Sequence, residues 1–362
     1  MAHGTARRTA GPVNTREANP VYKILVLVSE AYKFKLDNHS IIPSALYREG
    51  HEVSIGDIDS LCVHDSVVVC DQVKLSREFE AGGDFPTLSE SYASAEDFDL
   101  VWVLAGTHPE SSKDYFQLIW LLNQRVPFVN DATALFYLNS KTNLGAVVPS
   151  ENLPVSYVSN DFDFLNDLVG SDSERSWVIK PTNEGCGADV YVVNEKDRNR
   201  SALLSSATGN AASRYISYGR DIIGMAKRHT AVQEYIPNVR TNEKRVIIAG
   251  DTAVSGFLRF HRDNDNRANA SVGARFEGLR LTPEEEEDFV RVLGKRLMAH
   301  GIYYVGIDLA HPYVIEINME NPGGLNYHRR ATGEDQSSHA VNTVLAALRA
   351  GGKLGPERPP LV

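Results

Sequence analysis

The feature that most constrains the fold is a pair of short apolar segments near the C-terminal end of the chain. Ile302–Leu309 and Tyr313–Ile317 predict two antiparallel strands, joined in a hairpin that turns at His311-Pro312. Successive side chains of a strand point to opposite faces, so Ile317 packs on one face while its sequence neighbours project from the other. The pattern therefore predicts a hairpin with one apolar face and one polar face.

Three side chains with oxygen donors share the polar face. Glu316 and Asn318 are two residues apart, and Asp308 lies on the partner strand, where it can face both. Hard oxygen donors grouped in this way suit Mg²⁺ that also takes phosphate oxygens. A solvated hairpin face is the alternative, since Asp, Glu and Asn are common there. The apolar flanking residues favour the metal site, because buried carboxylates need a cation or other partners.

In the N-terminal part of the chain, predicted strands alternate with predicted helices. Strands are expected at Lys23–Ser29, Glu52–Ile58 and Asp99–Leu104, and helices at Ser40–Arg48 and Tyr115–Asn123. This alternation of strands and helices implies a small, mostly parallel sheet. Residues 1–20 hold glycines, threonines, prolines and paired arginines without an apolar core, and we expect a disordered tail there.

The pattern changes after Lys141, where strands separated by turns replace the strand–helix alternation. The expected strands are Trp177–Lys180, Val190–Val193, Ala231–Ile236, Arg245–Ala249 and Thr252–Phe260. We therefore expect a chain of α/β and α+β class, in which a parallel α/β domain precedes a region of long antiparallel strands.

A second candidate segment begins at the end of the first of these strands. Lys180 is followed by a turn that contains Gly185 and Gly187, and glycine lets backbone N–H groups approach phosphate oxygens closely. Lys180 would provide a compact positive charge for the α- or β-phosphate of a nucleotide. The segment lacks the Gly-x-x-x-x-Gly-Lys-Ser/Thr pattern of a P-loop, and by itself it also fits an ordinary hairpin.

The strand that stops at Pro237 carries a third candidate segment. Backbone N–H and C=O groups at its end can read an adenine edge, while Glu243 accepts hydrogen bonds from ribose hydroxyls. Arg245 on the next strand would then point toward the phosphates. A plain edge strand with surface charges is the alternative. The residues of the expected adenine-binding segment are Gln233, Glu234, Tyr235 and Ile236.

A polar stretch from Phe260 to Arg275 carries Arg262, Arg267 and Asn269. Such a segment could close over a nucleotide and exclude water from a labile intermediate. An ordinary surface loop has the same composition, so the sequence leaves both interpretations open.

Composition narrows the range of partners. The net charge of −10 argues against a broad nucleic-acid-binding face, and it means that a nucleotide site must supply its own cations. No run approaches the roughly 18 apolar residues of a membrane span. The three cysteines show no metal-type pairing, and their odd number argues against a disulfide framework, so we expect a reduced, cytoplasmic protein.

Taken in order, these segments resemble the ATP-grasp superfamily, most closely its bacterial glutathione synthetase branch. The resemblance is carried by Val178-Ile-Lys-Pro with its glycine-rich turn, Gln233-Glu-Tyr-Ile-Pro, Lys244-Arg-Val, the Arg267-x-Asn loop, and Asp308 followed after seven residues by Glu-Ile-Asn. It implies an ATP-grasp fold of three parts, with ATP between the last two. These parts would be an N-terminal α/β substrate domain (21–140), a small central lid domain (141–232) and a C-terminal antiparallel-sheet domain with the Mg²⁺ site (233–352).

The resemblance also implies roles for individual residues. Lys141 and Lys180 match the two ATP lysines, Glu234, Tyr235 and Ile236 the adenine hinge, and Glu243 the ribose-binding acid. Arg245 and Arg259 match positions near the phosphates and the acyl phosphate, Arg267 and Asn269 the flexible loop, and Asp308, Glu316 and Asn318 the magnesium ligands. The implied enzyme is an ATP- and Mg²⁺-dependent ligase, with Mn²⁺ as an alternative metal. It would join two amino-acid or peptide substrates through an acyl phosphate, and relatives commonly form dimers or tetramers.

The chain departs from the family pattern where the substrate is expected. The family has Asn-x-x-Ser-Pro-Thr followed by an Arg-Glu pair, but this chain continues from Asn318 to Asn326 and Tyr327 at the Arg and Glu positions. A basic stretch of the family also appears here as Ala105-Gly106-Thr107, and His108, Arg329 or Arg330 could compensate. We therefore expect an amino-acid or γ-glutamyl dipeptide ligase first, and glutathione synthetase, acting on γ-glutamylcysteine and glycine, second. A non-catalytic nucleotide-binding scaffold is the third interpretation, and the intact metal triad argues against it.

Overall fold

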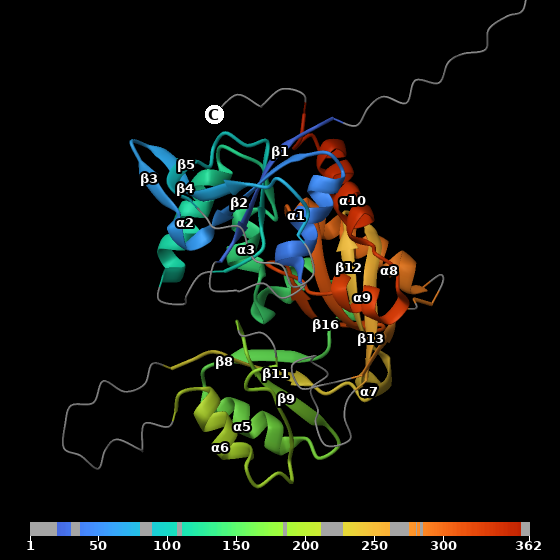
Figure 1. Cartoon of the computed structure of the whole chain (residues 1–362). Helices are drawn as coiled ribbons and strands as arrows, with labels where there is room; N and C mark the ends of the chain where they lie inside the picture. Colours follow the sequence, from blue (N-terminus) through green and yellow to red (C-terminus); the bar gives the residue numbers. More distant parts are fainter. Residues whose placement is uncertain are drawn as a thin grey trace, which may run out of the picture.

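The computed structural model describes residues 20–29, 37–79, 89–106, 111–183, 187–210, 227–260, 275–279, 281–282 and 285–355. Within these residues the chain forms three sheets flanked by helices (Figure 1). The expected tail up to residue 19, Gly185, Arg267 and Asn269 lie outside the described residues.

The N-terminal sheet has the strand order β3-β4-β2-β1-β6-β7, with β5 paired to β4. β1 pairs in parallel with β2 and β6, and β6 pairs in parallel with β7, as the strand–helix alternation predicted. Helix α1 packs on one face, and α2 and α3 pack on the other. The elements are β1 (Lys23–Val28), α1 (Asn38–Arg48), β2 (Glu52–Asp57), β3 (Cys62–His64), β4 (Val67–Lys74), β5 (Ser89–Ser94), β6 (Leu100–Val103), α2 (Ser112–Asn123), β7 (Phe128–Val129) and α3 (Ala132–Leu138).

One edge of this sheet is antiparallel, which the sequence did not predict. β4 pairs antiparallel with β2, β3 and β5. The β3–β4 turn consists of Asp65 and Ser66, whose φ values are +47° and +68°. Two-residue turns with positive φ match the twist of a hairpin, but the usual signal for them is Asn-Gly or Asp-Gly. The mostly parallel sheet that was expected is therefore limited to β2, β1, β6 and β7.

The central sheet is antiparallel, with the order β10-β9-β11-β8, and two helices cover it. The residues that we expected to separate the central and C-terminal parts, 232 and 233, both lie inside β11, so the sheet extends to Glu234. The elements are β8 (Ser156–Ser159), α5 (Phe162–Ser171), β9 (Ser176–Pro181), β10 (Tyr191–Asn194), α6 (Arg200–Ala207) and β11 (Thr230–Glu234). The short helix α4 (Leu144–Val147) precedes them and packs outside the central core.

The C-terminal sheet is antiparallel, with the order β14-β13-β12-β15-β16. The predicted hairpin is confirmed, since β15 and β16 pair up to Ala310 and Tyr313, on either side of His311-Pro312. The elements are α7 (Val239–Asn242), β12 (Glu243–Ala249), β13 (Thr252–Phe260), β14 (Arg275–Gly278), α8 (Glu285–Ala299), β15 (Tyr304–Ala310), β16 (Tyr313–Asn318), α9 (Leu325–Thr332) and α10 (Ser337–Ala350).

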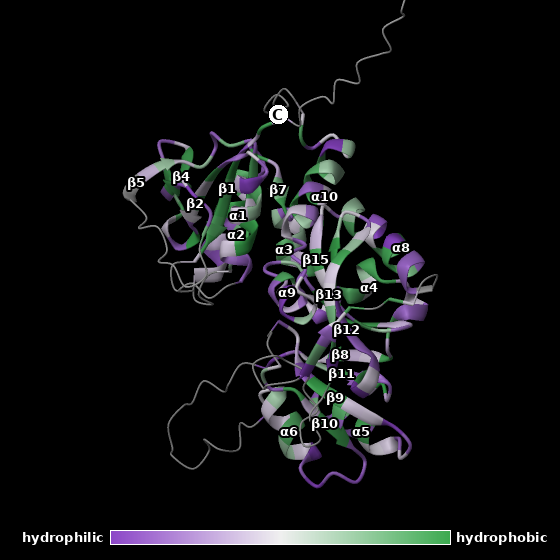
Figure 2. Cartoon of the chain, turned by 45° about the vertical axis from the view of Figure 1, so that its right-hand side comes forward, coloured by the Kyte–Doolittle hydropathy of each residue, from purple (hydrophilic) through white to green (hydrophobic). Residues whose placement is uncertain are grey.

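The distribution of apolar side chains divides the molecule unequally. Two large cores each combine residues of the N-terminal and C-terminal sheets: Leu25 and Ile307 belong to one, and Trp102 and Tyr304 to the other. The central sheet has a core of its own, centred on Trp177. In Figure 1 the central unit accordingly lies below the other two, and Figure 2 shows apolar segments on both the strands and the helices. None of the described helices is long and apolar enough to cross a membrane.

Candidate active site

The polar face of the C-terminal sheet holds the three residues predicted as metal ligands. The register of β15 and β16 places Asp308 opposite Glu316, and Gly306 opposite Asn318. Opposed residues of an antiparallel pair share one face, so all three side chains lie on the same side of the sheet. The structure thus brings them together as the hairpin pattern indicated, and their role as ligands stays a prediction.

Two arginines from neighbouring strands surround Asp308. Arg245 on β12 donates from Nε to Asp308 Oδ1 over 2.5 Å and from Nη2 to Oδ2 over 3.1 Å. Arg259 on β13 lies 3.1 Å from Asp308 Oδ2 through Nη1, and the same nitrogen donates to Glu243 Oε1 over 2.8 Å. All four side chains are nearly buried. Burial alone would raise the pKa of Asp308, but the two guanidinium groups hold that pKa below its usual range.

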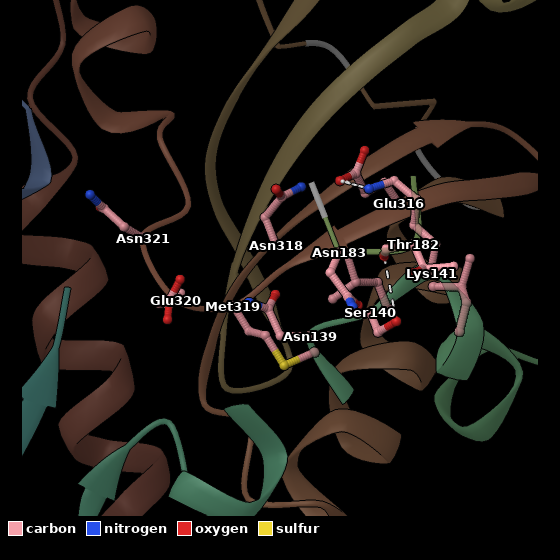
Figure 3. A pocket seen from close by; sticks show the side chains of 12 residues that line it. Asn139, Ser140, Lys141, Thr182, Asn183, Glu316, Asn318, Met319, Glu320 and Asn321 are labelled. Carbon is pink, nitrogen blue, oxygen red and sulfur yellow. Dashed lines mark hydrogen bonds and ion pairs between the residues drawn. The ribbon is translucent and has the colours of Figure 1, made fainter. Parts of the chain in front are cut away.

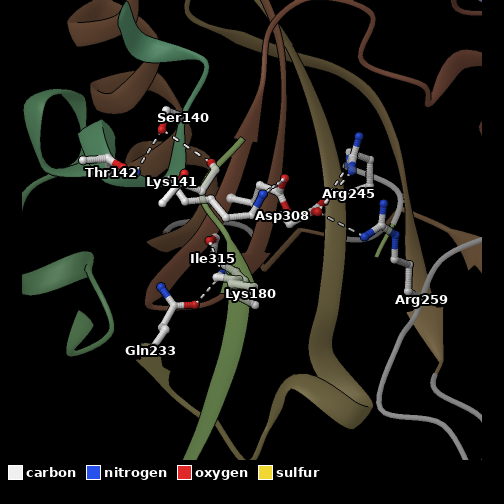
Figure 4. A network of polar contacts seen from close by, with 11 residues as sticks. Ser140, Lys141, Thr142, Lys180, Gln233, Arg245, Arg259, Asp308 and Ile315 are labelled. Carbon is white, nitrogen blue, oxygen red and sulfur yellow. Dashed lines mark hydrogen bonds and ion pairs between the residues drawn. The ribbon is translucent and has the colours of Figure 1, made fainter. Parts of the chain in front are cut away.

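Lys180 reaches the same region from the end of β9. Its Nζ donates to Gln233 Oε1 over 2.9 Å and to the backbone oxygen of Ile315 over 3.5 Å (Figure 4). Gln233 Nε2 in turn donates to Ser156 Oγ over 3.0 Å, which fixes the amide. The Gln233 side chain therefore positions Lys180, whereas the sequence had placed this residue in the adenine-binding segment.

Lys141 links the central and C-terminal sheets. Its Nζ lies 3.2 Å from Glu316 Oε1, and its backbone N–H donates to the oxygen of Thr182, just beyond β9, over 3.0 Å. Burial lowers the pKa of Lys180 to about 8; Glu316 opposes this effect, and the positive charge of Lys141 adds to it. One polar cluster thus contains four cationic side chains and three carboxylates. Because the chain as a whole is acidic, an anion-binding site needs such local cations. The members are Lys141, Lys180, Arg245, Arg259, Glu243, Asp308 and Glu316.

A pocket lies beside this cluster, between the central unit and the segment that follows β16 (Figure 3). Lys141 and Glu316 stand at one side of it, and Glu320 and Asn321 at the other. The lining residues are Asn139, Ser140, Lys141, Leu144, Thr182, Asn183, Glu316, Ile317, Asn318, Met319, Glu320 and Asn321.

The expected adenine-binding segment is only partly open to a ligand. The backbone N–H of Glu234 donates to Val155, and that of Tyr235 donates to Ser176, each over 2.8 Å. Both groups are thus used by the central sheet, and Ile236 follows the strand end. Gly187 is the described glycine of the Lys180 turn, and its φ of +73° is a value that glycine adopts without strain.

Sequence reasoning gave no role to Glu320 or Asn130. Glu320 lines the pocket, and burial raises the pKa of its carboxyl group. Asn130 is 1% exposed and binds backbone groups of Tyr303, Tyr304 and Met319. No spacing or motif marks either residue, because the residues that surround them in the fold are distant in the sequence.

The donor set fits a hard cation held together with phosphate. Among the described residues no cluster of three His, Cys, Asp or Glu side chains forms a metal site, so the amide of Asn318 is needed as a third donor. The Asn318 Nδ2 atom is buried without a hydrogen-bond partner in the described part of the chain. A bound phosphate oxygen would satisfy such a donor. Carboxylates interleaved with cations can hold Mg²⁺ and neutralise an oxyanion side by side.

A family model matches the part of the chain that contains this cluster. The model describes the ATP-grasp domain of prokaryotic glutathione synthetase, and it matches residues 144–333, more than half of the chain.

Individual proteins resemble the chain over most of its length. Glutathione synthetase of Gloeobacter violaceus is 27% identical over 313 residues, which cover 84% of this chain and 90% of that protein. The crystal structure of D-cycloserine synthetase DcsG superposes with a TM-score of 0.60 at 15% identity, covering 90% of this chain and 99% of the other. Macrocyclase MdnC from Microcystis aeruginosa, bound to its precursor peptide, gives a TM-score of 0.56 at 15% identity, with 90% and 99% coverage. At such low identity the two structures indicate a shared fold.

Proposed function

This chain belongs to the family of prokaryotic glutathione synthetase ATP-grasp domains, and from that premise we propose that it joins two amino-acid-like substrates through an amide bond. Membership of the family makes it an ATP-dependent ligase that forms carbon–nitrogen bonds. The proposal adds an acyl-phosphate intermediate, and it adds amino acids or short peptides as both carboxylate donor and amine acceptor. We also keep the three-part domain division, with the central unit extended to the end of β11, as part of the proposal.

The observation that carries the proposal is the alternation of charge on the polar face of the C-terminal sheet. Asp308 and Glu316 lie opposite each other, Arg245 and Arg259 flank Asp308, and Lys141 pairs with Glu316. Phosphoryl transfer needs positioning and charge neutralisation more than it needs a side-chain nucleophile. This cluster supplies both signs of charge within contact distance, as that reaction requires.

A divalent metal ion fits the same face. Asp308, Glu316 and Asn318 would hold Mg²⁺ by oxygen, and the ion when bound would neutralise the β- and γ-phosphates. In the structure, Asp308 and Glu316 are each paired with cationic side chains. When Mg²⁺ binds these carboxylates, phosphate oxygens would replace them as the partners of Arg245, Arg259 and Lys141. The charge balance of the cluster is therefore kept when metal and nucleotide bind together.

The proposed reaction has two steps. The substrate carboxylate attacks the γ-phosphorus of ATP in line, the bond to the β-phosphate oxygen breaks, and ADP leaves. The amine of the second substrate then attacks the acyl carbon, phosphate leaves with the bonding electrons, and the amine loses a proton. Lys180 and Arg245 would neutralise the charge of the phosphates, and Arg259 the oxyanion of the second step.

The nucleotide end of the site is more limited than the sequence suggested. Since the N–H groups of Glu234 and Tyr235 are engaged, an adenine edge would be read by Ile236 or by backbone carbonyl groups. Glu243 accepts from Arg259, so binding a ribose hydroxyl would divide its oxygens between sugar and guanidinium. We assign Gln233 to the positioning of Lys180.

The substrate end does not support glutathione synthesis. Tyr327 stands where the family has glutamate, and its ring packs 5.0 Å from the rings of both Phe257 and Phe276. A tyrosine ring packed against these two rings does not supply the negative charge that a glutamate would offer to a polar substrate. We therefore favour a substrate pair other than γ-glutamylcysteine and glycine.

The test is phosphate release with Mg-ATP across a panel of amino-acid pairs, with mass spectrometry of the products. The panel includes glutamate with each amino acid, and γ-glutamylcysteine with glycine. We expect ADP, phosphate and one new amide from a pair other than the second. Glu316→Gln should lower the turnover by about 100-fold or more. Glu287→Gln, the same change at an exposed position of α8, is the control and should leave turnover unchanged.

Two other outcomes would contradict the proposal in different ways. Turnover with γ-glutamylcysteine and glycine alone would restore glutathione synthetase as the function. ATP binding without phosphate release from any pair, unaffected by Glu316→Gln, would favour a nucleotide-binding scaffold.

A further inference from the structure

Glu320 is a carboxylate that lines the pocket. Within the described residues, no hydrogen bond or ion pair reaches it. Its two oxygens lie against Gly106, where a Cβ atom would come within 2.9 Å of Oε1 and 3.1 Å of Oε2. A carboxylate that is largely removed from water is unfavourable unless a cation or donors replace the water. Glu320 is therefore suited to bind a cation from outside the chain.

The segment that carries Glu320 is held on both sides. Asn130 Nδ2 donates to the backbone oxygen of Met319 over 2.7 Å. Asn38 Nδ2 donates to Asn321 Oδ1 over 3.0 Å and to the oxygen of Pro322 over 2.9 Å. These bonds hold the residues before and after the carboxylate, so its position does not depend on a ligand. Asn38 Oδ1, a second acceptor beside this segment, is buried without a partner among the described residues.

The two sides of the pocket differ in charge, because Lys141 is paired with Glu316 at one side and the carboxylate of Glu320 stands at the other. Lys141 is at the side where the phosphates are proposed to bind, and Glu320 is at the other side (Figure 3). Gly106 lies just beyond β6, whose end is next to that of β1 in the N-terminal sheet. The helices that follow β1 and β6, α1 and α2, pack on opposite faces of the sheet, and open α/β sheets bind ligands at such a point, outside the carboxyl ends of the strands.

We propose that Glu320 binds the ammonium group of an amino-acid substrate whose carboxylate faces the Lys141 side of the pocket. The inference rests on the proposed function and specifies its carboxylate donor as a zwitterion. An ammonium group donates up to three hydrogen bonds, and Glu320 accepts from it as the charged partner. The ammonium end of such a substrate complements the carboxylate of Glu320, and its carboxylate end lies toward the side where ATP is proposed to bind.

The test measures binding rather than turnover, so that it does not depend on finding the second substrate. Each of the twenty common amino acids and its N-acetyl derivative is titrated calorimetrically against the full chain, with Mg²⁺ and a non-hydrolysable ATP analogue present. We expect at least one amino acid to bind saturably, and its acetylation to weaken binding by roughly 10- to 100-fold. Glu320→Gln should remove that difference and leave the affinity for the ATP analogue unchanged.

A second variant moves the carboxylate without removing its charge. Gly106→Ala places a methyl group against the flexible end of Glu320, which can shift, so the fold should be kept. This variant should bind the amino acid more weakly and the ATP analogue with unchanged affinity. Glu287→Gln should change neither affinity. The proposal is overturned if no amino acid binds or if acetylation does not weaken binding. It is also overturned if Glu320→Gln still binds the free amino acid more tightly than its N-acetyl derivative. Binding as expected, with no product from any substrate pair, would instead contradict the ligase proposal.

Discussion

Lys180 shows how burial adjusts a single charge in the site. Its ammonium group donates to two neutral acceptors, the Gln233 amide and the Ile315 carbonyl. Burial is the largest influence on this group and lowers its pKa from 10.5 to about 8. The charge of Glu316 raises the pKa, and the charge of Lys141 lowers it. The group therefore titrates close to the pH at which enzymes are usually assayed.

We expect the affinity for ATP to fall as pH rises through about 8, because the neutral amine no longer attracts phosphate. Stability should change in the opposite direction. The folded pKa is lower than the unfolded one, so the unfolded chain binds more protons between about 8 and 10.5, and stability rises with pH in that window. ATP titrations and urea unfolding, each carried out at a series of pH values between about 7 and 10, measure the two trends.

Lys180→Arg is the matched variant, since a guanidinium stays charged over this range. Its affinity for ATP should not decline near pH 8. A decline of equal size in the variant would assign the pH dependence to another group.

Helix α8 illustrates how one element supports the site from behind. It packs on the apolar face of the C-terminal sheet, opposite the polar cluster, through Val290, Leu293 and Leu297. Glu286 forms a buried ion pair with Lys244, the β12 neighbour of Arg245. The helix therefore helps to fix the strand from which the phosphate-facing arginine projects.

Gly294→Ala should destabilise the protein, although alanine is the better helix former. A Cβ atom at Gly294 would lie 2.6 Å from Asp251 Cα and 2.7 Å from the oxygen of Gly250, both of them backbone atoms in the β12–β13 turn. Overpacking of this kind costs about 1–3 kcal/mol. Equilibrium unfolding in urea measures the change.

Gly170→Ala in helix α5 is the control of opposite sign. The three atoms nearest to its Cβ would all belong to the flexible guanidinium of Arg200, at 3.1 Å or more, so the variant should be as stable as the parent or gain up to about 1 kcal/mol. Equal effects at the two glycines would show that the contact with the β12–β13 turn is unimportant.

The N-terminal and C-terminal sheets form one body because they share their apolar cores, and Asn130 adds a polar connection between them. Asn130 Oδ1 accepts from the N–H groups of Tyr303 and Tyr304, and its Nδ2 donates to the oxygens of Tyr304 and Met319. One amide thus joins the end of β7 to the start of β15 and to the segment that carries Glu320. The geometry of the pocket depends on this connection between distant parts of the chain.

Asn130→Asp should destabilise the whole molecule, because a carboxylate has no N–H group to donate and would face two carbonyl oxygens. Leaving buried groups unsatisfied costs about 1–3 kcal/mol each, so we expect a loss of roughly 2–5 kcal/mol in the free energy of unfolding. Urea unfolding measures it, and Asn139→Asp, in a pocket-lining residue outside the core, is the comparison. A loss of similar size in both variants would contradict a special role for Asn130.

The sequence by itself determined the local elements. Short apolar runs and alternating patterns located strands in each of the three sheets, including the hairpin that holds Asp308 opposite Glu316, because such patterns depend on nearby residues. The edge strands β8 and β14 were not predicted. The mostly parallel character of the N-terminal sheet was correct around β1, but the antiparallel edge of β3 to β5 was missed. The Asp65-Ser66 turn lacks the glycine by which such hairpins are recognised.

The tertiary structure alone decided which of these elements meet. The enclosure of Asp308 by two arginines, the use of Gln233 to hold Lys180 and the contact of Glu320 with Gly106 all join residues from separate elements. Such contacts follow from strand register and from the packing of one sheet on another, which are set by the sum of many weak interactions over the whole chain. A local pattern can name the chemical groups of a site, but their pairing depends on how the complete chain packs.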